Sequence, residues 1–310
     1  MSITFVNAAE TRERVGMPTA VDAVREAFRD YAAGRFISPV RTAFGNGQVL
    51  VMPVYHIPSA SAAVKTLQVR LDRTPAITGV IVWTDAEGEV VMDASEITAI
   101  RTGAAAGVAT DLLAPVDSRR MVMIGAGAQA FDQVAAVLAV RNLEHLTVIS
   151  RTGSSAERLA EAVRKTWPGL GVDTASDPGP ALRRADIVSC ATSSSTPVFN
   201  ASDLPERVHV NGIGSYTPSM REIPQEALLG ARVVVDSLEA ALKEAGELIG
   251  AVGAGVLDPQ SIQELGTALD TPAGGTRTVF KSVGLALQDW ALAGLVARSV
   301  RTPEAAAPPG

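Results

Sequence analysis

The sequence predicts an α/β protein of two parts: a Rossmann-type domain with a doubly wound parallel sheet, and an α+β domain with an antiparallel sheet. From about residue 119, short apolar runs alternate with helical patterns, which is the order of βαβ units and favours a parallel sheet covered on both faces. Before residue 94, β-rich runs follow one another through turns, which is typical of antiparallel hairpins.

The antiparallel domain is expected to begin with an amphipathic helix over residues 18–33. This segment starts with a proline, ends before Gly34, and has apolar residues at helical spacing: Val21, Val24, Phe28 and Tyr31. Strands are expected over residues 48–55, 62–71, 78–85 and 90–93. A helix capped by Ser95 should follow over residues 97–114, and Pro115 should end it.

In the parallel domain, the expected strands and helices alternate. Strands are expected over residues 119–125, 145–150, 171–175, 185–192, 208–214 and 231–237. Helices are expected over residues 129–140 and 155–167, the second opened by a capping box of Ser154 and Glu157. The segment 276–299 is interpreted as one long helix that returns to the first domain.

These elements set the expected domain limits. Residues 1–114 form the first domain, which a C-terminal helix over residues 282–300 completes, and residues 115–281 form the Rossmann domain. Residues 301–310 are expected to be a loose tail.

Composition excludes several classes of protein. The 310 residues are 47% hydrophobic and 19% charged, a globular composition, and a net charge of −6 gives no sign of a nucleic-acid or membrane-surface partner. The single cysteine, Cys190, excludes an intramolecular disulfide and fits a reducing compartment, so we expect a cytoplasmic protein without a signal peptide or membrane span. The dispersed His56, His145 and His209 lack metal-site spacing, and no metal is expected.

The segment GAGAQA lies between the first apolar strand and the first helix of the parallel domain. Gly125, Gly127 and Ala130 occupy the positions of the G-x-G-x-x-G/A motif, with Ala128 and Gln129 in the same loop. The glycines allow a tight turn and close approach of the backbone to a pyrophosphate, which the helix N-terminus then stabilises. The motif therefore predicts a dinucleotide site.

The end of the second parallel strand indicates which dinucleotide is preferred. NAD sites usually carry an acidic residue there for the ribose 2′-hydroxyl, whereas this chain has Ser150, Arg151 and Thr152. A guanidinium between two hydroxyls suits a 2′-phosphate. We therefore expect NADP(H) to be preferred, with NAD(H) possible.

Several motifs, taken in order, carry a resemblance to a known family: AAVKTLQV, MDASEITAIRTGAAAGVAT, GAGAQA, VNGIGSYTPSMREI and FKSVGLALQD. On these segments the chain resembles the ornithine cyclodeaminase/μ-crystallin family from about Arg41 to Trp290. The resemblance implies a homodimer formed through the antiparallel-sheet domain. It also implies an amino or imino acid held between that domain and a nicotinamide.

The resemblance assigns substrate and cofactor residues. Arg41, Lys65 and Arg101 would bind the substrate carboxylate, with Lys65 and Arg101 as the catalytic pair. Guanidinium groups with a nearby ammonium suit a planar carboxylate, and a cation in an apolar strand or helix is costly unless it has a function. Other expected contacts are Met52 beside the substrate ring, Val283 beside the ring and cofactor, and Thr102 and Thr192 at the cofactor.

One departure from the family pattern decides between its reactions. In the cyclodeaminases an aspartate lies two residues before the proline of the loop after the fifth Rossmann strand. Alignment on Pro218 puts Tyr216 there, beside Ser215, so the chain has no carboxylate for the second amine of ornithine. Tyr216 becomes a candidate substrate contact, and the segment resembles the reductase branch.

The sequence thus predicts an NAD(P)H-dependent reductase of cyclic ketimines. The favoured reaction is Δ1-pyrroline-2-carboxylate to L-proline, with the six-membered homologue, Δ1-piperideine-2-carboxylate to L-pipecolate, also considered. Lys65, a bound water and Tyr216 remain open as proton donors. The alternatives are an ornithine cyclodeaminase, an open-chain amino acid dehydrogenase, and a non-catalytic NADP-binding protein like μ-crystallin.

Overall fold

The computed structural model describes residues 3–45, 47–70, 72, 75, 77–271 and 275–301. The chain divides into two compact units: the first is Met1–Arg101 with Leu285–Gly310, and the second is Thr102–Gly284. The expected α/β class is confirmed, because the second unit has a parallel sheet and the first a mainly antiparallel one. The expected domain limits at residues 114 and 282 stay a prediction. Within the described ranges, no helix is long and apolar enough to cross a membrane.

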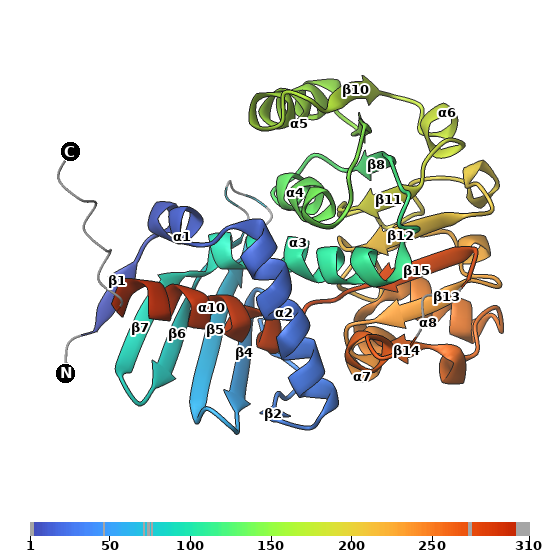
Figure 1. Cartoon of the computed structure of the whole chain (residues 1–310). Helices are drawn as coiled ribbons and strands as arrows, with labels where there is room; N and C mark the ends of the chain where they lie inside the picture. The colour runs from blue at the N-terminus through green and yellow to red at the C-terminus, as the bar shows by residue number, and fades with distance from the viewer. Residues whose placement is uncertain are drawn as a thin grey trace. The chain divides into compact units, whose positions relative to one another are not determined.

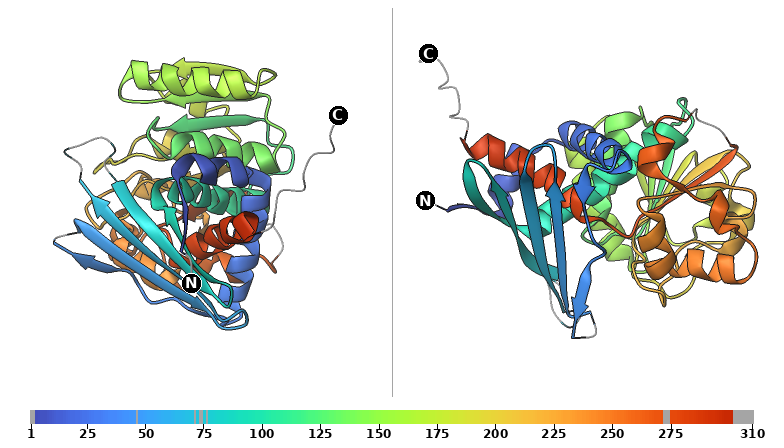
Figure 2. Two further views of the ribbon diagram at one scale, coloured as in Figure 1. Left: turned by 90° about the vertical axis from the view of Figure 1, so that its left-hand side faces the viewer. Right: turned by 90° about the horizontal axis from the view of Figure 1, so that it is seen from below.

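The first unit is a seven-stranded sheet in the order β1-β7-β6-β5-β4-β2, with β3 also paired to β4. Its strands are β1 (Thr4–Val6), β2 (Phe36–Ile37), β3 (Thr42–Phe44), β4 (Val49–His56), β5 (Ser61–Val69), β6 (Ile77–Asp85) and β7 (Gly88–Asp93). Its helices are α1 (Ala8–Arg14), α2 (Met17–Ala32), the start of α3 (Ala94–Leu113), and α10 (Ala286–Arg301). Figure 2 shows α2 and α10 on the same face of this sheet.

The aromatic core under α10 fixes the position of that helix on β4, β5 and β6 (Figure 1). Trp290 donates its indole N–H to Ser61 Oγ at 2.9 Å, and its ring lies 5.7 Å from that of Trp83. Gly294 gives Trp83 room, since a Cβ there would lie 2.9 Å from the Trp83 ring. These contacts hold α10 against β5 and β6.

Two expected helix caps are wrong. Helix α3 begins at Ala94, and the carboxylate of Asp93, not Ser95, accepts from the backbone N–H groups of Ser95 and Glu96. Helix α5 (Gly153–Thr166) has Thr152 at its N-cap and no side-chain cap, because Glu157 binds Arg164 and Thr174 instead of closing a capping box. A capping box of Asn7 and Glu10 opens α1, which the sequence analysis did not predict.

The second unit is an eight-stranded, all-parallel sheet in the order β10-β9-β8-β11-β12-β15-β13-β14, with helices on both faces (Figures 1 and 2). Its strands are β8 (Arg120–Ile124), β9 (His145–Ile149), β10 (Gly171–Ala175), β11 (Ile187–Cys190), β12 (Val208–Gly212), β13 (Arg232–Val235), β14 (Gln263–Glu264) and β15 (Arg277–Lys281). Its other helices are α4 (Ala130–Val140), α6 (Gly179–Leu182), α7 (Leu238–Glu244), α8 (Gly246–Gly253) and α9 (Leu265–Ala268), with 3-10 turns at Ala201–Asp203, Gln225–Ala227 and Pro259–Ser261.

The largest error of the sequence analysis concerns residues 276–299. They form strand β15 and then α10, not one helix, and the C-terminal helix expected over residues 282–300 begins at Ala286. Strand β15 lies between β12 and β13, so successive residues such as Val279 and Phe280 are both buried, as they would be in a buried helix. A short apolar run does not distinguish a buried strand from a buried helix. Gly284, with a φ of +87°, separates the two elements. Arg301 ends α10, and the rest of the expected tail lies outside the described residues.

Arg141 ties the end of α3 to the end of α4. Its side chain is almost completely buried, and its guanidinium donates to the carbonyl oxygens of Thr110, Asp111, Ala114, Pro115 and Val140 at 2.7–3.1 Å. It also lies 2.9 Å from the carboxylate of Asp111. These carbonyls include the unpaired groups that end a helix, so one cation satisfies the C-terminus of α3.

We therefore expect Arg141→Ala to lower the free energy of unfolding by about 3 kcal/mol or more, because several buried carbonyls lose their donor. Urea unfolding followed by circular dichroism measures this change. Arg120→Ala, which removes an exposed arginine, is the control and should change stability by less than about 0.5 kcal/mol. Equal stabilities of the two variants would contradict this account of Arg141.

Candidate active site

The glycine loop joins β8 to α4 at the carboxyl edge of the parallel sheet. Gly125 has a φ of +105°, and a Cβ there would lie 2.4 Å from the carbonyl oxygen of Ala191, so a larger residue would displace the loop. At Gly127 a Cβ would meet nothing within 4 Å. The backbone of Gly127 therefore borders open space, which close approach of a pyrophosphate requires. Ala130 is buried at the start of α4.

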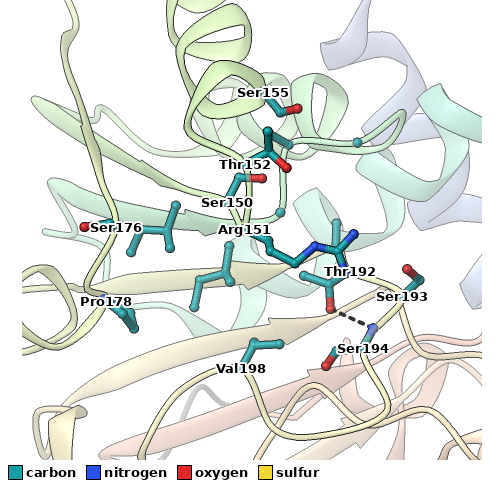
Figure 3. A pocket seen from close by; sticks show the side chains of 16 residues that line it. Ser150, Arg151, Thr152, Ser155, Ser176, Pro178, Thr192, Ser193, Ser194 and Val198 are labelled. Atoms are coloured by element: carbon teal, nitrogen blue, oxygen red, sulfur yellow. Dashed lines mark hydrogen bonds between the residues drawn. The ribbon is translucent and has the colours of Figure 1, made fainter.

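A cavity of about 570 Å³ borders this loop (Figure 3). It lies where β9 and β11 flank β8, the point at which the strand order reverses and α/β sheets bind ligands. Its lining includes these residues of the expected cofactor site: Gly125, Gly127, Ser150, Arg151, Thr152 and Thr192. Ala128 and Gln129 belong to the same loop but are not among its lining residues.

The end of β9 gives the cavity one cation and several hydroxyls. Arg151 is exposed, and Figure 3 shows its side chain extending from β9 toward Thr192. Ser155 and Ser176 add hydroxyls to those of the residues that flank Arg151. None of the described lining residues is an aspartate or a glutamate. The cavity can therefore accept an anion at the end of β9.

Glu222 holds the loops that follow β11 and β12. Its carboxylate accepts from the backbone N–H groups of Thr192 at 2.5 Å, Gly214 at 2.6 Å and Ser215 at 3.1 Å, and the residue is completely buried. Burial raises the pKa of Glu222, although the nearby Lys281 and the N–H donors act in the opposite direction. The position of Thr192 at the cavity thus depends on a carboxylate that the sequence analysis missed.

A second buried network holds the loops after β12 and β15. Lys281 Nζ donates to the carbonyl oxygens of Gly212, Ser215 and Ser282 at 2.6–3.1 Å. Asp236 accepts from the backbone N–H groups of Val283 and Gly284 at 2.9 and 2.7 Å. Val283 is consequently fixed and buried.

Two further expected site residues belong to the second unit. Tyr216 is half-buried in the loop after β12. Its neighbour Ser215 donates its hydroxyl to Glu247 at 2.7 Å. Thr102 is buried on α3.

The first unit contains a separate cluster of buried charges. Lys65 on β5 has its Nζ 2.6 Å from Asp289 Oδ2, and Arg101 on α3 has its Nε 3.2 Å from Asp289 Oδ1. Arg101 also donates from Nη1 to Gln288 Oε1 at 2.6 Å. The alternation of β5 explains this placement, because Ala63, Lys65 and Leu67 all point to the covered face of the sheet.

Burial lowers the pKa of Lys65 to about 7. The charge of Asp289 raises this pKa, whereas the charges of Arg101 and Arg41 lower it. Arg41, in the segment before β3, is thus close enough for its charge to affect Lys65. Met52 on β4 is the residue paired with Lys65 across the sheet. The structure brings the predicted substrate residues Arg41, Lys65 and Arg101 into one electrostatic cluster.

The histidines have ordinary polar partners, and the cysteine is free and buried. His56 lies between Ser59 and Asp30, His145 pairs with Asp173, and His209 lies between Thr278 and Asn211. Burial lowers the pKa of His209 to about 3, so it is neutral. Burial raises the pKa of the Cys190 thiol well above its usual value, which agrees with a structural interpretation of that residue. In the described part of the chain, no group of three His, Cys, Asp or Glu side chains is arranged to hold a metal.

Sequence reasoning missed Asp289, Glu222, Lys281 and Asp236. Each is an ionisable side chain that the fold buries. For Asp289, Lys281 and Asp236, which lie in segments rich in apolar or small residues, the cost of burying an unpaired charge is the signal that could have found them. That signal was applied to Lys65 and Arg101 but not to the QD pair that follows FKSVGLAL.

Comparison with known proteins identifies relatives along nearly the whole chain. The model of the ornithine cyclodeaminase/mu-crystallin family matches residues 2–304. A Δ1-pyrroline-2-carboxylate reductase of Bacillus cereus is 35% identical over 302 residues, which cover 92% of each chain.

Two solved structures are also similar. The Δ1-pyrroline-2-carboxylate reductase of Thermococcus litoralis, solved with NADH and L-proline, has a TM-score of 0.90 at 31% identity and covers 96% of this chain and 97% of its own. An archaeal alanine dehydrogenase, solved as a dimer with bound NAD, has a TM-score of 0.88 at 28% identity and covers 98% of both chains.

Proposed function

Because the chain belongs to the ornithine cyclodeaminase/mu-crystallin family, we propose that it is a nicotinamide-dependent reductase that converts Δ1-pyrroline-2-carboxylate to L-proline, and its six-membered homologue to L-pipecolate. Relatives that share its length and about a third of its residues carry the first of these activities. The observation that carries the proposal is the buried cluster of Lys65, Arg101 and Asp289, a cationic site inside an apolar core.

The cation cluster suits the carboxylate of an imino acid. Arg101 offers a planar guanidinium, Lys65 a compact ammonium, and Arg41 a further positive charge. Fixing the carboxylate fixes the adjacent C=N carbon, and orientation of this kind supplies much of the rate of a bimolecular step. Met52, buried beside Lys65, would border the ring.

The second unit fits a dinucleotide. Gly127 leaves room for a pyrophosphate, the cavity lies at the carboxyl edge of the sheet, and Thr192 and Val283 are held rigidly by buried carboxylates. When bound, a reduced nicotinamide supplies a hydride to the C=N carbon while the nitrogen takes or keeps a proton, which gives the amine. The residues that would hold it are Thr102, Gly125, Gly127, Ala128, Gln129, Ser150, Arg151, Thr152, Thr192 and Val283.

The loop after β12 supports a reductase over a cyclodeaminase. Tyr216 stands where the cyclodeaminases have an aspartate, and the neighbouring Ser215 hydroxyl is bound by the buried Glu247. Glu222, the other carboxylate at this loop, is occupied by three backbone N–H groups. Neither carboxylate is free to receive the side-chain amine of ornithine.

The purified protein should oxidise NADPH or NADH when given Δ1-pyrroline-2-carboxylate, which absorbance at 340 nm measures. Arg101→Leu should lower kcat/KM about 100-fold by removing a charged contact with the substrate carboxylate, while dinucleotide binding persists. Arg29→Leu, on the exposed surface of α2, is the control and should keep full activity. Release of ammonia from ornithine without net cofactor oxidation would instead indicate a cyclodeaminase.

We also propose that NADP(H) is preferred over NAD(H). Arg151, flanked by Ser150 and Thr152, offers a charge and hydroxyls where a 2′-phosphate would lie, and none of the described residues lining the cavity is acidic.

Arg151→Ala should therefore raise KM for NADPH about 10- to 100-fold, the loss expected for one charged hydrogen bond, and leave KM for NADH nearly unchanged. Steady-state kinetics with both cofactors measure the two constants. Lys165→Ala, which removes an exposed lysine from α5, is the matched control. An equal loss with both cofactors would count against the preference.

We propose that the protein forms a homodimer through the outer face of the first unit's sheet. An apolar row crosses five strands on the face opposite α2 and α10, because the register aligns Pro53, Val64, Val82, Val91 and Phe5. Phe5 is 72% exposed and Val80, on the same face, is 46% exposed. An exposed apolar face of this extent is typical of an interface.

Val80→Lys should convert the protein from twice the chain mass of 32.1 kDa to a single chain, because a dimer would bury the new charge without a partner. Size-exclusion chromatography with light scattering measures the mass. Val116→Lys, at an exposed position of the second unit, should leave the dimer intact. A wild-type monomer would refute the proposed assembly.

We propose that the enzyme is cytoplasmic. Cys190, the one cysteine of the chain, is free and buried. A single cysteine cannot form an intramolecular disulfide, which is typical of a protein from a reducing compartment.

A further inference from the structure

Asp289 lies between the two buried cations of the first unit. Its oxygens face different partners: Oδ2 lies 2.6 Å from Lys65 Nζ, and Oδ1 lies 3.2 Å from Arg101 Nε. The Asp289 side chain is 1% exposed, and that of Lys65 is 0% exposed. The other buried residues of this part of α10, such as Leu287 and Leu292, are apolar. Because a buried ion pair contributes little net stability compared with apolar packing, its presence here suggests a specific use.

We propose that Asp289 is a positioning residue of the substrate site, which fixes Lys65 Nζ and Arg101 Nε as one rigid pair and offsets one of their positive charges. This inference rests on the proposed function, since the pair is useful when an anionic carboxylate binds it. Gln288 supports the arrangement, because its Oε1 accepts from Arg101 Nη1 at 2.6 Å. Two successive residues of α10 thus set the orientation of one guanidinium.

The charge balance shows why an imine reductase needs this carboxylate. Arg41, Lys65 and Arg101 carry three positive charges when Lys65 is protonated, and the substrate carboxylate cancels one. A C=N bond accepts hydride more readily when its nitrogen is protonated, which adds a further positive charge nearby. Asp289 cancels a second cation and lowers the repulsion that this protonated nitrogen would meet.

The same carboxylate controls the protonation of Lys65. The charged groups that face Lys65 are Asp289 from α10, Arg101 from α3 and Arg41 from the segment before β3. The neighbours across the sheet, Met52 on β4 and Ile81 on β6, do not titrate. Asp289 raises the pKa of Lys65, whereas burial and both arginines lower it, to about 7. Removing the Asp289 charge should therefore lower this pKa further.

The composition allows a direct test, because the chain has only four lysines: Lys65, Lys165, Lys243 and Lys281. Protein labelled with 13C at lysine Cε gives four NMR signals, and a Lys65→Arg variant assigns the one from Lys65. In the wild type this signal should titrate near pH 7. In Asp289→Asn its midpoint should fall by at least one pH unit, about a tenfold loss of protonated Lys65 above the midpoint. Asp289→Glu keeps the charge, so its Lys65 midpoint should lie close to that of the wild type.

Kinetics supply a second readout that a purely structural role would not produce. In Asp289→Asn the alkaline limb of kcat/KM should move to lower pH, and KM for the imino acid should rise at least tenfold while KM for the dinucleotide stays unchanged. Glu26→Gln, an exposed carboxylate on α2, is the matched control and should change neither constant.

The two hypotheses fail separately. A wild type inactive on cyclic imines would refute the proposed function, yet the NMR titration would still test Asp289. An unshifted Lys65 midpoint in Asp289→Asn would overturn the role of Asp289. If Asp289→Asn does not fold, a Lys65 midpoint in Asp289→Glu that lies a full unit below that of the wild type would overturn it too.

Discussion

The attraction between one buried carboxylate and two buried cations is the interaction on which the substrate half of this protein depends. Lys65, Arg101 and Asp289 come from a strand, a helix and the C-terminal helix, so three distant segments meet at one set of charges. Each charge alone would be costly in an apolar core, and together they remain net positive. The cluster is therefore stable enough to exist and still charged enough to bind an anion.

The second unit uses buried carboxylates in a related way. Glu222 and Asp236 do not border the cavity; they accept backbone N–H groups of the loops that do, or that carry Val283. Because these acceptors are inside the protein, the loops are fixed before any ligand arrives, and binding loses less conformational entropy. In both units, then, a buried carboxylate contributes by fixing the position of a neighbouring cation or loop.

Local patterns in the sequence were sufficient for the fold class, and the proposed site residues came from these patterns together with the family resemblance. β-rich runs separated by turns placed β4 to β7, and the glycine motif placed the turn after β8. The family resemblance singled out Lys65 and Arg101, and the cost of a cation in an apolar segment supported that choice. The failures have physical causes. Strand β15 has the continuous apolar pattern of a buried helix, and only its pairing with β12 and β13 decides its structure.

The missed residues depended on contacts between distant segments. Serine is a residue type that often caps helices, so Ser95 and Ser154 were reasonable candidates. Asp93 caps α3 instead of Ser95, and α5 begins without a side-chain cap. Asp289 was missed because its partners, Lys65 and Arg101, lie far away in the chain, before the whole parallel sheet. Glu222 was missed because its carboxylate accepts from backbone N–H groups, which the sequence pattern does not mark, in its own loop and at Thr192. Such partners become visible only when the fold brings them together.

The most direct test of this account is a crystal structure of the protein with L-proline and an oxidised nicotinamide dinucleotide. We expect the proline carboxylate within about 3 Å of the Arg101 guanidinium and Lys65 Nζ, with its α-carbon at about 3.5 Å from C4 of the nicotinamide. A proline bound elsewhere, with Lys65 and Arg101 paired only to Asp289, would contradict it.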